Sequence, residues 1–349
     1  MSQARGFASD NQAGVHPAVL EAIAAANAGH APSYGHDGLT ERARARFREH
    51  FGEVARAFPV FNGTAANVLS LRAACRPWEA VICADSAHLN VDEGGAPEAI
   101  AGVKLLCVEG VDGKLTPELV TERTLARRGD EHQVQARVVS ISQSTELGTV
   151  YGVDELAALG EVAHAAGLIL HVDGARLSNA AAALDLPLRE LSTDVGVDVI
   201  SFGGTKNGLL GAEAVVFLND ELAHGFLYLR KQSLQLASKM RFLAAQLDAL
   251  LTDGLYLQLA GHANAMAARL AAAVGELPGV TITRPVQANA VFAILPPGAA
   301  ERLQERFAFY IWDERSCEVR WMCSWDTTAE DVDEFAAAVA EVAAAAATA

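Results

Sequence analysis

The stretch Leu168–Gly208 decides the fold: LILHVDGARLSNAAAALDLPLRELSTDVGVDVISFGGTKNG. It contains two short apolar runs, LILHV and VDVISF, and each is typical of a buried strand because it is rich in branched residues and ends at glycine or polar residues. Asp173 and Arg176 follow the first run, and Lys206 follows the second. Ligands in open α/β sheets bind outside the carboxyl ends of the strands. The stretch therefore places a carboxylate, a guanidinium and an amine at one edge of a sheet.

A carboxylate and a lysine at such an edge suit pyridoxal phosphate. This cofactor needs a lysine that holds its aldehyde as a Schiff base and an anionic partner for its pyridinium nitrogen. We predict that Lys206 binds the aldehyde and that Asp173 faces the ring nitrogen. The alternative is an ordinary dinucleotide-binding-like sheet that carries an Asp and a Lys on its surface.

A second segment fits the phosphate of the same cofactor. The run 57–61 indicates a strand, and Asn62-Gly63-Thr64 then opens a helix. The first turn of a helix offers free backbone N–H groups, a capping hydroxyl and the positive end of the helix dipole, so it binds anions. We expect Gly63 and Thr64 to bind the phosphate; most such caps, taken alone, bind only their own helix.

The composition is that of an ordinary globular protein. The chain has 349 residues, of which 51% are hydrophobic and 20% are charged. A formal net charge of −16 disfavours nucleic acid and anionic membrane surfaces as partners. No apolar run has the length of a membrane helix, and the N-terminal MSQARGFASDNQAG lacks the apolar segment of a secretory signal. We predict a cytoplasmic protein that binds neither nucleic acid nor membranes.

The cysteines give no sign of disulfides or metal. They are odd in number and form no CxxC motif, and they are Cys75, Cys83, Cys107, Cys317 and Cys323. Three of them lie in apolar runs typical of strands or strand ends. Buried free thiols in a reducing compartment are the simplest interpretation, and we predict no metal site.

The order of elements predicts a large α/β domain followed by a smaller one. Strands and helices alternate from residue 57 to 218, which favours a mostly parallel, doubly wound sheet. After a helix at 257–274, the chain changes to short strands flanked by helices, which indicates a small α+β domain. The predicted parts are an N-terminal arm (1–15), a large cofactor-binding domain (16–252) and a small C-terminal domain (253–349).

The motifs HVDGAR and SFGGTKNG resemble those of the threonine aldolase branch of the type-I pyridoxal-phosphate enzymes, and the resemblance runs from Ser9 to Trp325. It implies the type-I transferase-like fold for the large domain. It also implies a homo-oligomer, either a dimer or a tetramer, in which a second subunit shares the active site.

The resemblance further implies roles for residues outside the central stretch. Arg320, a guanidinium in an otherwise apolar strand, matches the arginine that holds the substrate α-carboxylate; a structural ion pair is the alternative. Ser9 matches a serine that helps to receive the same carboxylate, and Tyr34 a tyrosine that approaches the site, although both also fit simple turns. Lys231 and Arg241 match residues that reach the phosphate of the neighbouring subunit. These two lie in 226–246, which indicates a long helix or a broken pair.

The same resemblance implies that Arg176 hydrogen-bonds the phenolic oxygen of the cofactor and lies on the substrate side of the site. His88 lies where the family stacks an aromatic ring on the cofactor, and its imidazole can also handle a proton. We expect His88, directly or through water, to remove the β-hydroxyl proton of the substrate, with Glu93 as the second candidate. One branch of the family has a histidine where this chain has Thr145, beside Glu146, which leaves the identity of the base open.

The expected reaction is a retro-aldol cleavage of L-threonine, L-allo-threonine and related β-hydroxy-α-amino acids, including phenylserine, to glycine and an aldehyde. Broad tolerance of the aldehyde is expected, because selection of one extra methyl group is difficult. Another type-I activity, such as β-elimination or transamination, is the alternative enzyme function. A cofactor-binding protein without catalysis is the alternative outside enzymes.

Overall fold

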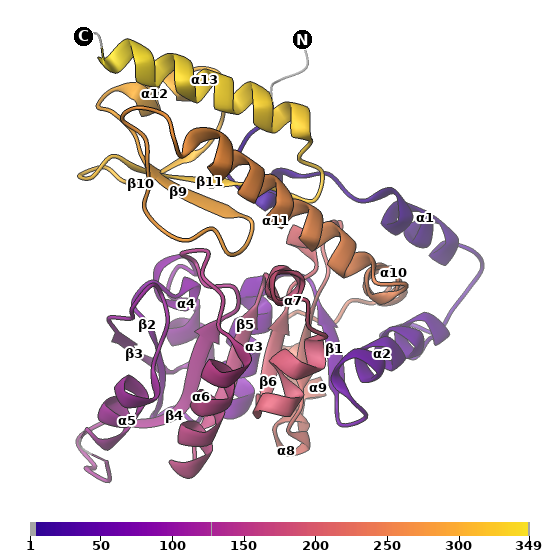
Figure 1. The fold of residues 1–349 in the computed structure, drawn as a ribbon. Helices are drawn as coiled ribbons and strands as arrows, with labels where there is room; N and C mark the ends of the chain where they lie inside the picture. The colour runs from indigo at the N-terminus through magenta and orange to yellow at the C-terminus, as the bar shows by residue number, and fades with distance from the viewer. Residues whose placement is uncertain (1–4, 127, 348–349) are drawn as a thin grey trace.

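The computed structural model describes residues 5–126 and 128–347, and it contains two sheets (Figure 1). The larger sheet has seven strands in the order β1-β7-β6-β5-β4-β2-β3, and the smaller has four in the order β10-β11-β9-β8. The strands of the larger sheet are β1 (Arg56–Val60), β2 (Glu79–Ala84), β3 (Lys104–Val108), β4 (Gln135–Ser142), β5 (Ile169–Gly174), β6 (Val199–Phe202) and β7 (Glu213–Phe217).

The larger sheet is mostly parallel, as predicted. Strands β3, β2, β4, β5 and β6 run parallel to one another, whereas β7 is antiparallel to both β6 and β1. In the pairing of β5 with β6, Asp173 lies opposite Ser201. The carboxyl ends of these two strands therefore meet at one edge, and the segment after each strand faces the same space.

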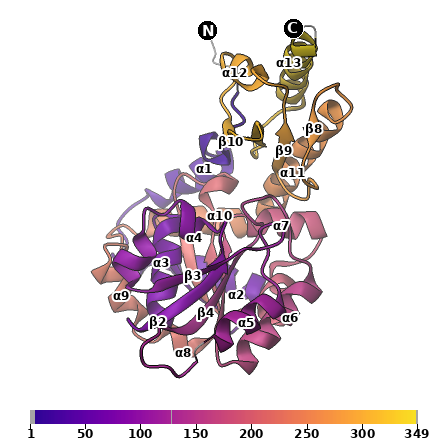
Figure 2. The ribbon, with the colours of Figure 1, turned by 90° about the vertical axis from the view of Figure 1, so that its left-hand side faces the viewer.

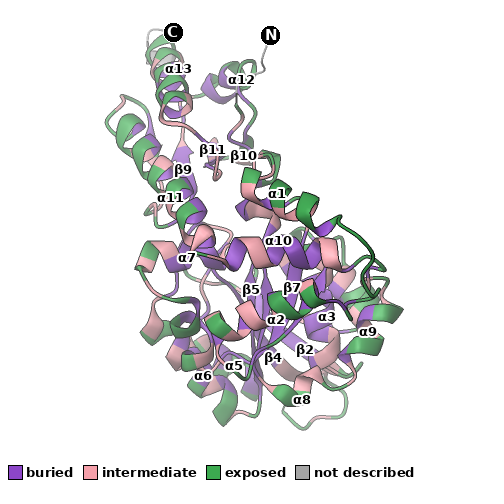
Figure 3. Cartoon of the chain, turned by 90° about the vertical axis from the view of Figure 1, so that its right-hand side faces the viewer, coloured by how far each residue is buried: buried purple, intermediate pink, exposed green. Residues whose placement is uncertain are grey.

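Helices cover both faces of this sheet, which explains why its strands are almost continuously apolar. Figure 2 shows α3 (Gly63–Ala74) and α9 (Phe226–Gln232) on one side, and α5 (Pro117–Leu125) and α6 (Val153–Ala165) on the other. The sheet between them is buried (Figure 3). The other helices of this part are α1 (Pro17–Ala26), α2 (Gly38–Phe51), α4 (His88–Val91), α7 (Leu177–Leu184), α8 (Asp220–Ala223) and α10 (Arg241–Leu251).

The smaller sheet has its own core against three helices. Its elements are α11 (Leu255–Val274), β8 (Thr281–Ile282), β9 (Ala290–Ile294), α12 (Ala299–Gln304), β10 (Tyr310–Asp313), β11 (Glu318–Met322) and α13 (Ala329–Ala347). The N-terminal half of α11, with Tyr256 and Leu259, packs into the core of the larger sheet, and its C-terminal half, with Leu270 and Val274, packs into the core of the smaller one. This helix joins the two parts, and the domain boundary at 252–253 stays a prediction.

The start of the chain joins the smaller sheet. Phe7 donates its backbone N–H to the Ala308 carbonyl over 2.7 Å and accepts from the Met322 N–H over 2.8 Å. Its buried ring stacks on Phe335, with 4.2 Å between the ring centroids. Residues 1–4 of the predicted arm lie outside the described part of the chain. The arm thus brings the next residues, Ala8 to Asn11, to the gap between the sheets.

Two expectations need refinement. The segment 226–246 contains two helices, α9 and the start of α10, because the chain turns between them with Leu234 at a φ of 65°. The expectation of buried thiols is wrong for Cys107, which is exposed because β3 is an edge strand, whereas Cys83 and Cys323 are buried. Within the described residues, none of the helices combines the length and apolarity that a membrane span requires.

Candidate active site

The predicted cofactor residues meet at the carboxyl edge of β5 and β6. Asp173 lies at the end of β5, and Lys206 lies in the short 3-10 helix Thr205–Asn207 that follows β6. Both line a cavity of about 300 Å³. The lining also includes Gly63, Thr64, His88 and Glu213. The sheet therefore brings a carboxylate, an amine and a helix N-terminus together around one space.

The glycines before Lys206 allow a close approach between neighbouring segments. A Cβ atom on Gly203 would lie 2.5 Å from the Ala175 carbonyl oxygen, so a side chain there would force β5 and β6 apart. Glu213 accepts a hydrogen bond from the Gly204 N–H over 2.7 Å. Burial raises the pKa of the Glu213 carboxyl. These contacts fix the loop that presents Lys206 to the cavity.

Lys206 lies in an environment that favours its neutral amine. The positive charge of Arg176 is the largest cause that lowers the pKa of Lys206, and burial lowers it further. A lysine amine attacks a carbonyl only when it is unprotonated. The surroundings of Lys206 therefore increase the reactive fraction of this side chain at neutral pH.

Asp173 is buried and held by two donors. Its Oδ1 atom accepts from the Ala175 N–H over 3.0 Å, and its Oδ2 atom accepts from Asn67 Nδ2 over 2.7 Å. Asn67 lies on α3, one helical turn after the glycine that begins this helix. The segment after β5 and helix α3 thus together fix the position and orientation of the Asp173 carboxylate.

His88 and Glu93 form a hydrogen-bonded pair beside the cavity. His88 Nδ1 lies 2.9 Å from Glu93 Oε1, and the Glu93 side chain has no exposed surface. The Glu93 bond is the largest cause that raises the pKa of His88, and burial opposes it. Since Nδ1 contacts Glu93, the other ring nitrogen of His88 is the one without a partner among the described residues. Glu93 therefore orients His88 from behind and does not line the cavity itself.

The backbone of His88 is anchored by Glu146. The His88 N–H donates to Glu146 Oε1 over 2.9 Å, and the Ser142 hydroxyl donates to the same oxygen over 2.5 Å. Burial raises the pKa of Glu146, and the nearby charge of Asp173 adds to this effect. Glu146 thus connects the N-terminus of α4, where His88 lies, to the end of β4.

Arg176 and Arg320 lie where the arm meets the two sheets. Arg176 donates to Asp10 through two hydrogen bonds, Nε to Oδ2 over 2.7 Å and Nη2 to Oδ1 over 2.9 Å. Asn289 Nδ2 donates to the same carboxylate over 3.0 Å. The arm residue Asp10 therefore holds Arg176 at the site from one side.

Arg320 has no ion-pair partner within residues 5–126 and 128–347. Its Nη2 atom donates to the Ala8 carbonyl over 3.4 Å, and its buried Nε atom has no hydrogen-bond partner in the same residues. The rings of Tyr310 and Trp312 lie 5.4 and 5.0 Å from its guanidinium carbon. A half-buried guanidinium favours an anionic partner. The alternative of a structural ion pair finds no carboxylate among the described residues, and a substrate carboxylate fits the Nε donor.

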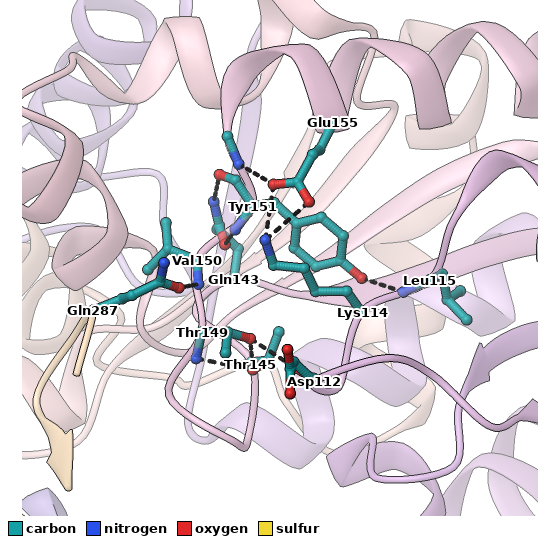
Figure 4. A network of polar contacts seen from close by, with 11 residues as sticks. Asp112, Lys114, Leu115, Gln143, Thr145, Thr149, Val150, Tyr151, Glu155 and Gln287 are labelled. Atoms are coloured by element: carbon teal, nitrogen blue, oxygen red, sulfur yellow. Dashed lines mark hydrogen bonds and ion pairs between the residues drawn. The ribbon is translucent and has the colours of Figure 1, made fainter. Parts of the chain in front are cut away.

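Thr145 lies away from the cavity. Its hydroxyl is 2.6 Å from that of Thr149, whose hydroxyl in turn donates to the Asp112 carbonyl over 2.7 Å. Figure 4 shows this network, in which Gln287 also accepts from the Val150 N–H. Thr145 therefore stabilises a buried loop, and it does not line the cavity formed by Lys206, Asp173 and His88.

Four further predicted residues also lie outside the cavity lining. Ser9 caps a short 3-10 helix by accepting from the Asn11 N–H over 3.2 Å. Tyr34 is 44% exposed, and Lys231 Nζ lies 5.1 Å from the centroid of its ring. Arg241 donates to the Gly29 carbonyl over 3.3 Å. Within a single chain, these residues do not meet Lys206.

Sequence reasoning missed three residues that shape the site: Asp10, Asn67 and Glu213. Asp10 was visible only as part of a turn-like Ser-Asp-Asn, and its partner Arg176 is 166 positions away along the chain. Asn67 lies inside α3, among consecutive buried residues, where a lone amide is inconspicuous. Glu213 opens an otherwise apolar strand, and a buried charge at such a position is the signal that could have identified it.

The fold and the site define an α/β enzyme in which a lysine and an aspartate line one cavity at the carboxyl edge of a mostly parallel sheet. Comparisons with known proteins agree. The model of the beta-eliminating lyase family matches residues 6–296, and the chain belongs to this family. It is 48% identical to a low specificity L-threonine aldolase of Pseudomonas aeruginosa over 95% of both chains, and 46% identical to one of a Pseudomonas sp. over 97% of this chain and 98% of that one.

A solved structure supports the same relationship. The threonine aldolase of Leishmania major superimposes with a TM-score of 0.92 and 31% sequence identity, covering 97% of this chain and 99% of that one. The fold is therefore that of the type-I pyridoxal-phosphate enzymes, as the sequence motifs implied.

Proposed function

We propose that this protein is a pyridoxal-phosphate-dependent aldolase that cleaves L-threonine, L-allo-threonine and related β-hydroxy-α-amino acids to glycine and an aldehyde. The observation that carries the proposal is the meeting of Lys206, Asp173 and His88 around one cavity. Arg320, whose buried Nε has no partner among the described residues, lies close enough to Arg176 and Asp10 for their charges to act on it. The similarity to two low specificity L-threonine aldolases over nearly the whole chain supports it.

The residues present fit pyridoxal phosphate. Lys206 would hold its aldehyde, Asp173 its ring nitrogen, and the N–H groups at Gly63 and Thr64 its phosphate, because this helix begins at the cavity with free donors. Arg176 keeps Nη1 free of partners among the described residues, which suits the phenolic oxygen. When bound, the cofactor accepts the electron pair of the bond that breaks next to the α-carbon.

The carboxylate of the substrate determines which bond breaks. Arg320 would bind it through a planar fork of two N–H groups, with Ser9 at the arm as a second contact. A substrate fixed in this way presents its Cα–Cβ bond in one orientation to the cofactor ring, and precise orientation lowers the barrier.

His88 would take the β-hydroxyl proton. Its Nδ1 atom is engaged by Glu93, so Nε2 is the nitrogen that can accept a proton, directly or through one water. Glu93 stabilises the charged imidazole that results. His88 thus stays the first candidate for the base, and Glu93, the second, is buried behind it and supports the base instead of replacing it.

We also propose an oligomeric state, a location and a range of accepted aldehydes for this protein. We expect a homo-oligomer, dimer or tetramer, because Lys231 and Arg241 lie outside the cavity of their own chain and match residues that reach the phosphate of a neighbouring subunit. We also propose a cytoplasmic location. The acceptance of several aldehydes follows from the small part that the side chain beyond the β-carbon plays in the reaction.

Two experiments test the function. Borohydride reduction of the purified protein with pyridoxal phosphate, followed by peptide mapping, should place the label on Lys206; a label on another lysine would contradict the proposal. Incubation with threonine, allo-threonine and phenylserine should release acetaldehyde from the first two and benzaldehyde from the third. A keto acid instead of an aldehyde would indicate β-elimination or transamination, and bound cofactor without turnover would indicate a binding protein.

A further inference from the structure

Asn67 stands between two buried carboxylates. Its Nδ2 atom donates to Asp173 Oδ2 over 2.7 Å and to Glu93 Oε1 over 2.8 Å. The same Glu93 oxygen lies 2.9 Å from His88 Nδ1. One amide group therefore joins the carboxylate that faces the cofactor ring nitrogen to the carboxylate that holds the proposed base.

The chemistry of an amide suits this position. Its NH₂ group carries two hydrogens, so it can donate to both carboxylates at once. Asn67 is 2% exposed, and Asp173 and Glu93 are 6% and 7% exposed, so bulk water cannot replace these bonds. Two buried carboxylates near each other stay ionised only if donors compensate their charges. The Asn67 amide is the donor that both of them share.

The two carboxylate acceptors set the orientation of the Asn67 amide. Asn67 Oδ1 and Glu93 Oε2 are buried and have no hydrogen-bond partner in the described part of the chain. If the amide were turned over, its oxygen would face two carboxylate oxygens, which is unfavourable. The two acceptors therefore fix the side chain, although its own oxygen remains unsatisfied.

We propose that Asn67 is a positioning residue that holds the carboxylates of Asp173 and Glu93 in place together, so that Asp173 serves the cofactor ring and Glu93 holds His88. The part of this inference that concerns catalysis rests on the proposed function of His88. The part that concerns the two carboxylates does not depend on which reaction the enzyme catalyses. Asn67 acts through these residues and does not itself contact the substrate.

The test uses the full-length Asn67→Leu variant, with Ser70→Ala as the control. Ser70 is a buried polar residue on the same helix, and its hydroxyl donates to the Ala66 carbonyl. The first measurement is the pKa of His88 in the cofactor-free protein by NMR titration. Without the amide, Glu93 is no longer held against His88 Nδ1 and stabilises the imidazolium less, so the pKa of His88 should fall in Asn67→Leu and stay unchanged in Ser70→Ala.

The second measurement is the affinity for pyridoxal phosphate. We expect Asn67→Leu to raise the Kd about tenfold or more, the size of effect that loss of a charged hydrogen bond produces. Asn67→Asp keeps the size of the side chain but, when ionised, donates to neither carboxylate, so it should also weaken cofactor binding at pH 8 if the Leu variant does not fold. Unchanged His88 pKa and cofactor affinity in the folded variants would overturn the proposal. A protein that meets both expectations but does not cleave threonine would contradict the proposed function alone.

Discussion

Asp10 holds Arg176 through two hydrogen bonds of 2.7 and 2.9 Å, and the side chains of both residues are almost completely buried. This pair joins the N-terminal arm to the helix that follows the strand of Asp173. The arm is thereby part of the site, because the residue next to Asp10 is Ser9 and the carbonyl of Ala8 contacts Arg320.

The Asp10–Arg176 pair makes a prediction about stability. Removal of one partner from a buried ion pair leaves an uncompensated charge and costs about 3–5 kcal/mol. Asp10→Ala should therefore lower the free energy of unfolding by this amount in denaturant titrations. The control is Asp333→Ala, which breaks a pair of similar geometry with Arg269 whose side chains are 58% and 47% exposed. Its loss should change the free energy of unfolding much less, because solvent screens an exposed pair, and equal losses in both variants would contradict the argument.

Arg320 should not be replaceable by lysine. Arg320→Lys keeps the charge but loses the planar pair of donors, and loss of a charged hydrogen bond costs about 1.5–3 kcal/mol. We expect kcat/KM for threonine to fall accordingly, with cofactor binding unchanged. Arg315→Lys, an exposed residue of the same hairpin, is the control. An unchanged kcat/KM in Arg320→Lys would mean that the carboxylate is bound elsewhere.

The two roles of His88 can be separated with phenylalanine. His88→Phe keeps a flat ring for stacking on the cofactor but cannot accept a proton. We expect normal cofactor binding and a decrease of roughly 10²–10⁴-fold in kcat, the usual contribution of general acid–base catalysis. His132→Phe, which changes an exposed histidine, should have no effect. If His88→Phe cleaves threonine at the normal rate, a water or another group is the base.

The pH dependence of the reaction should respond to Glu93. The bond from Glu93 is the largest cause that raises the pKa of His88, and a base must be unprotonated, so activity should rise with pH through this pKa. Glu93→Gln removes the negative charge, so the pKa of His88 should fall and the acidic limb of kcat/KM should move to lower pH. Full pH profiles of both proteins measure this shift. A limb that stays in place or moves to higher pH would separate Glu93 from the titration.

The positions of those site residues that directly follow a strand could be predicted from the sequence. Lys206, Asp173 and the Gly63 turn each follow a recognisable strand, and parallel pairing brings such positions to one edge. Asn67 and Asp10 could not be found in this way, because their partners come from segments that only the packed fold brings together. The roles of Lys231 and Arg241 stay predictions because their expected partner is another chain, and the role of Tyr34 stays a prediction because its side chain lies outside the cavity lining.

The most direct test of the central claim follows the carbon atoms of the substrate. Purified enzyme loaded with pyridoxal phosphate is incubated with uniformly ¹³C-labelled L-threonine, and the products are observed by NMR. Cleavage between Cα and Cβ predicts labelled glycine and labelled acetaldehyde in equal amounts, because the four-carbon chain divides into two fragments of two carbons. An intact four-carbon keto acid, with no glycine, would contradict the account.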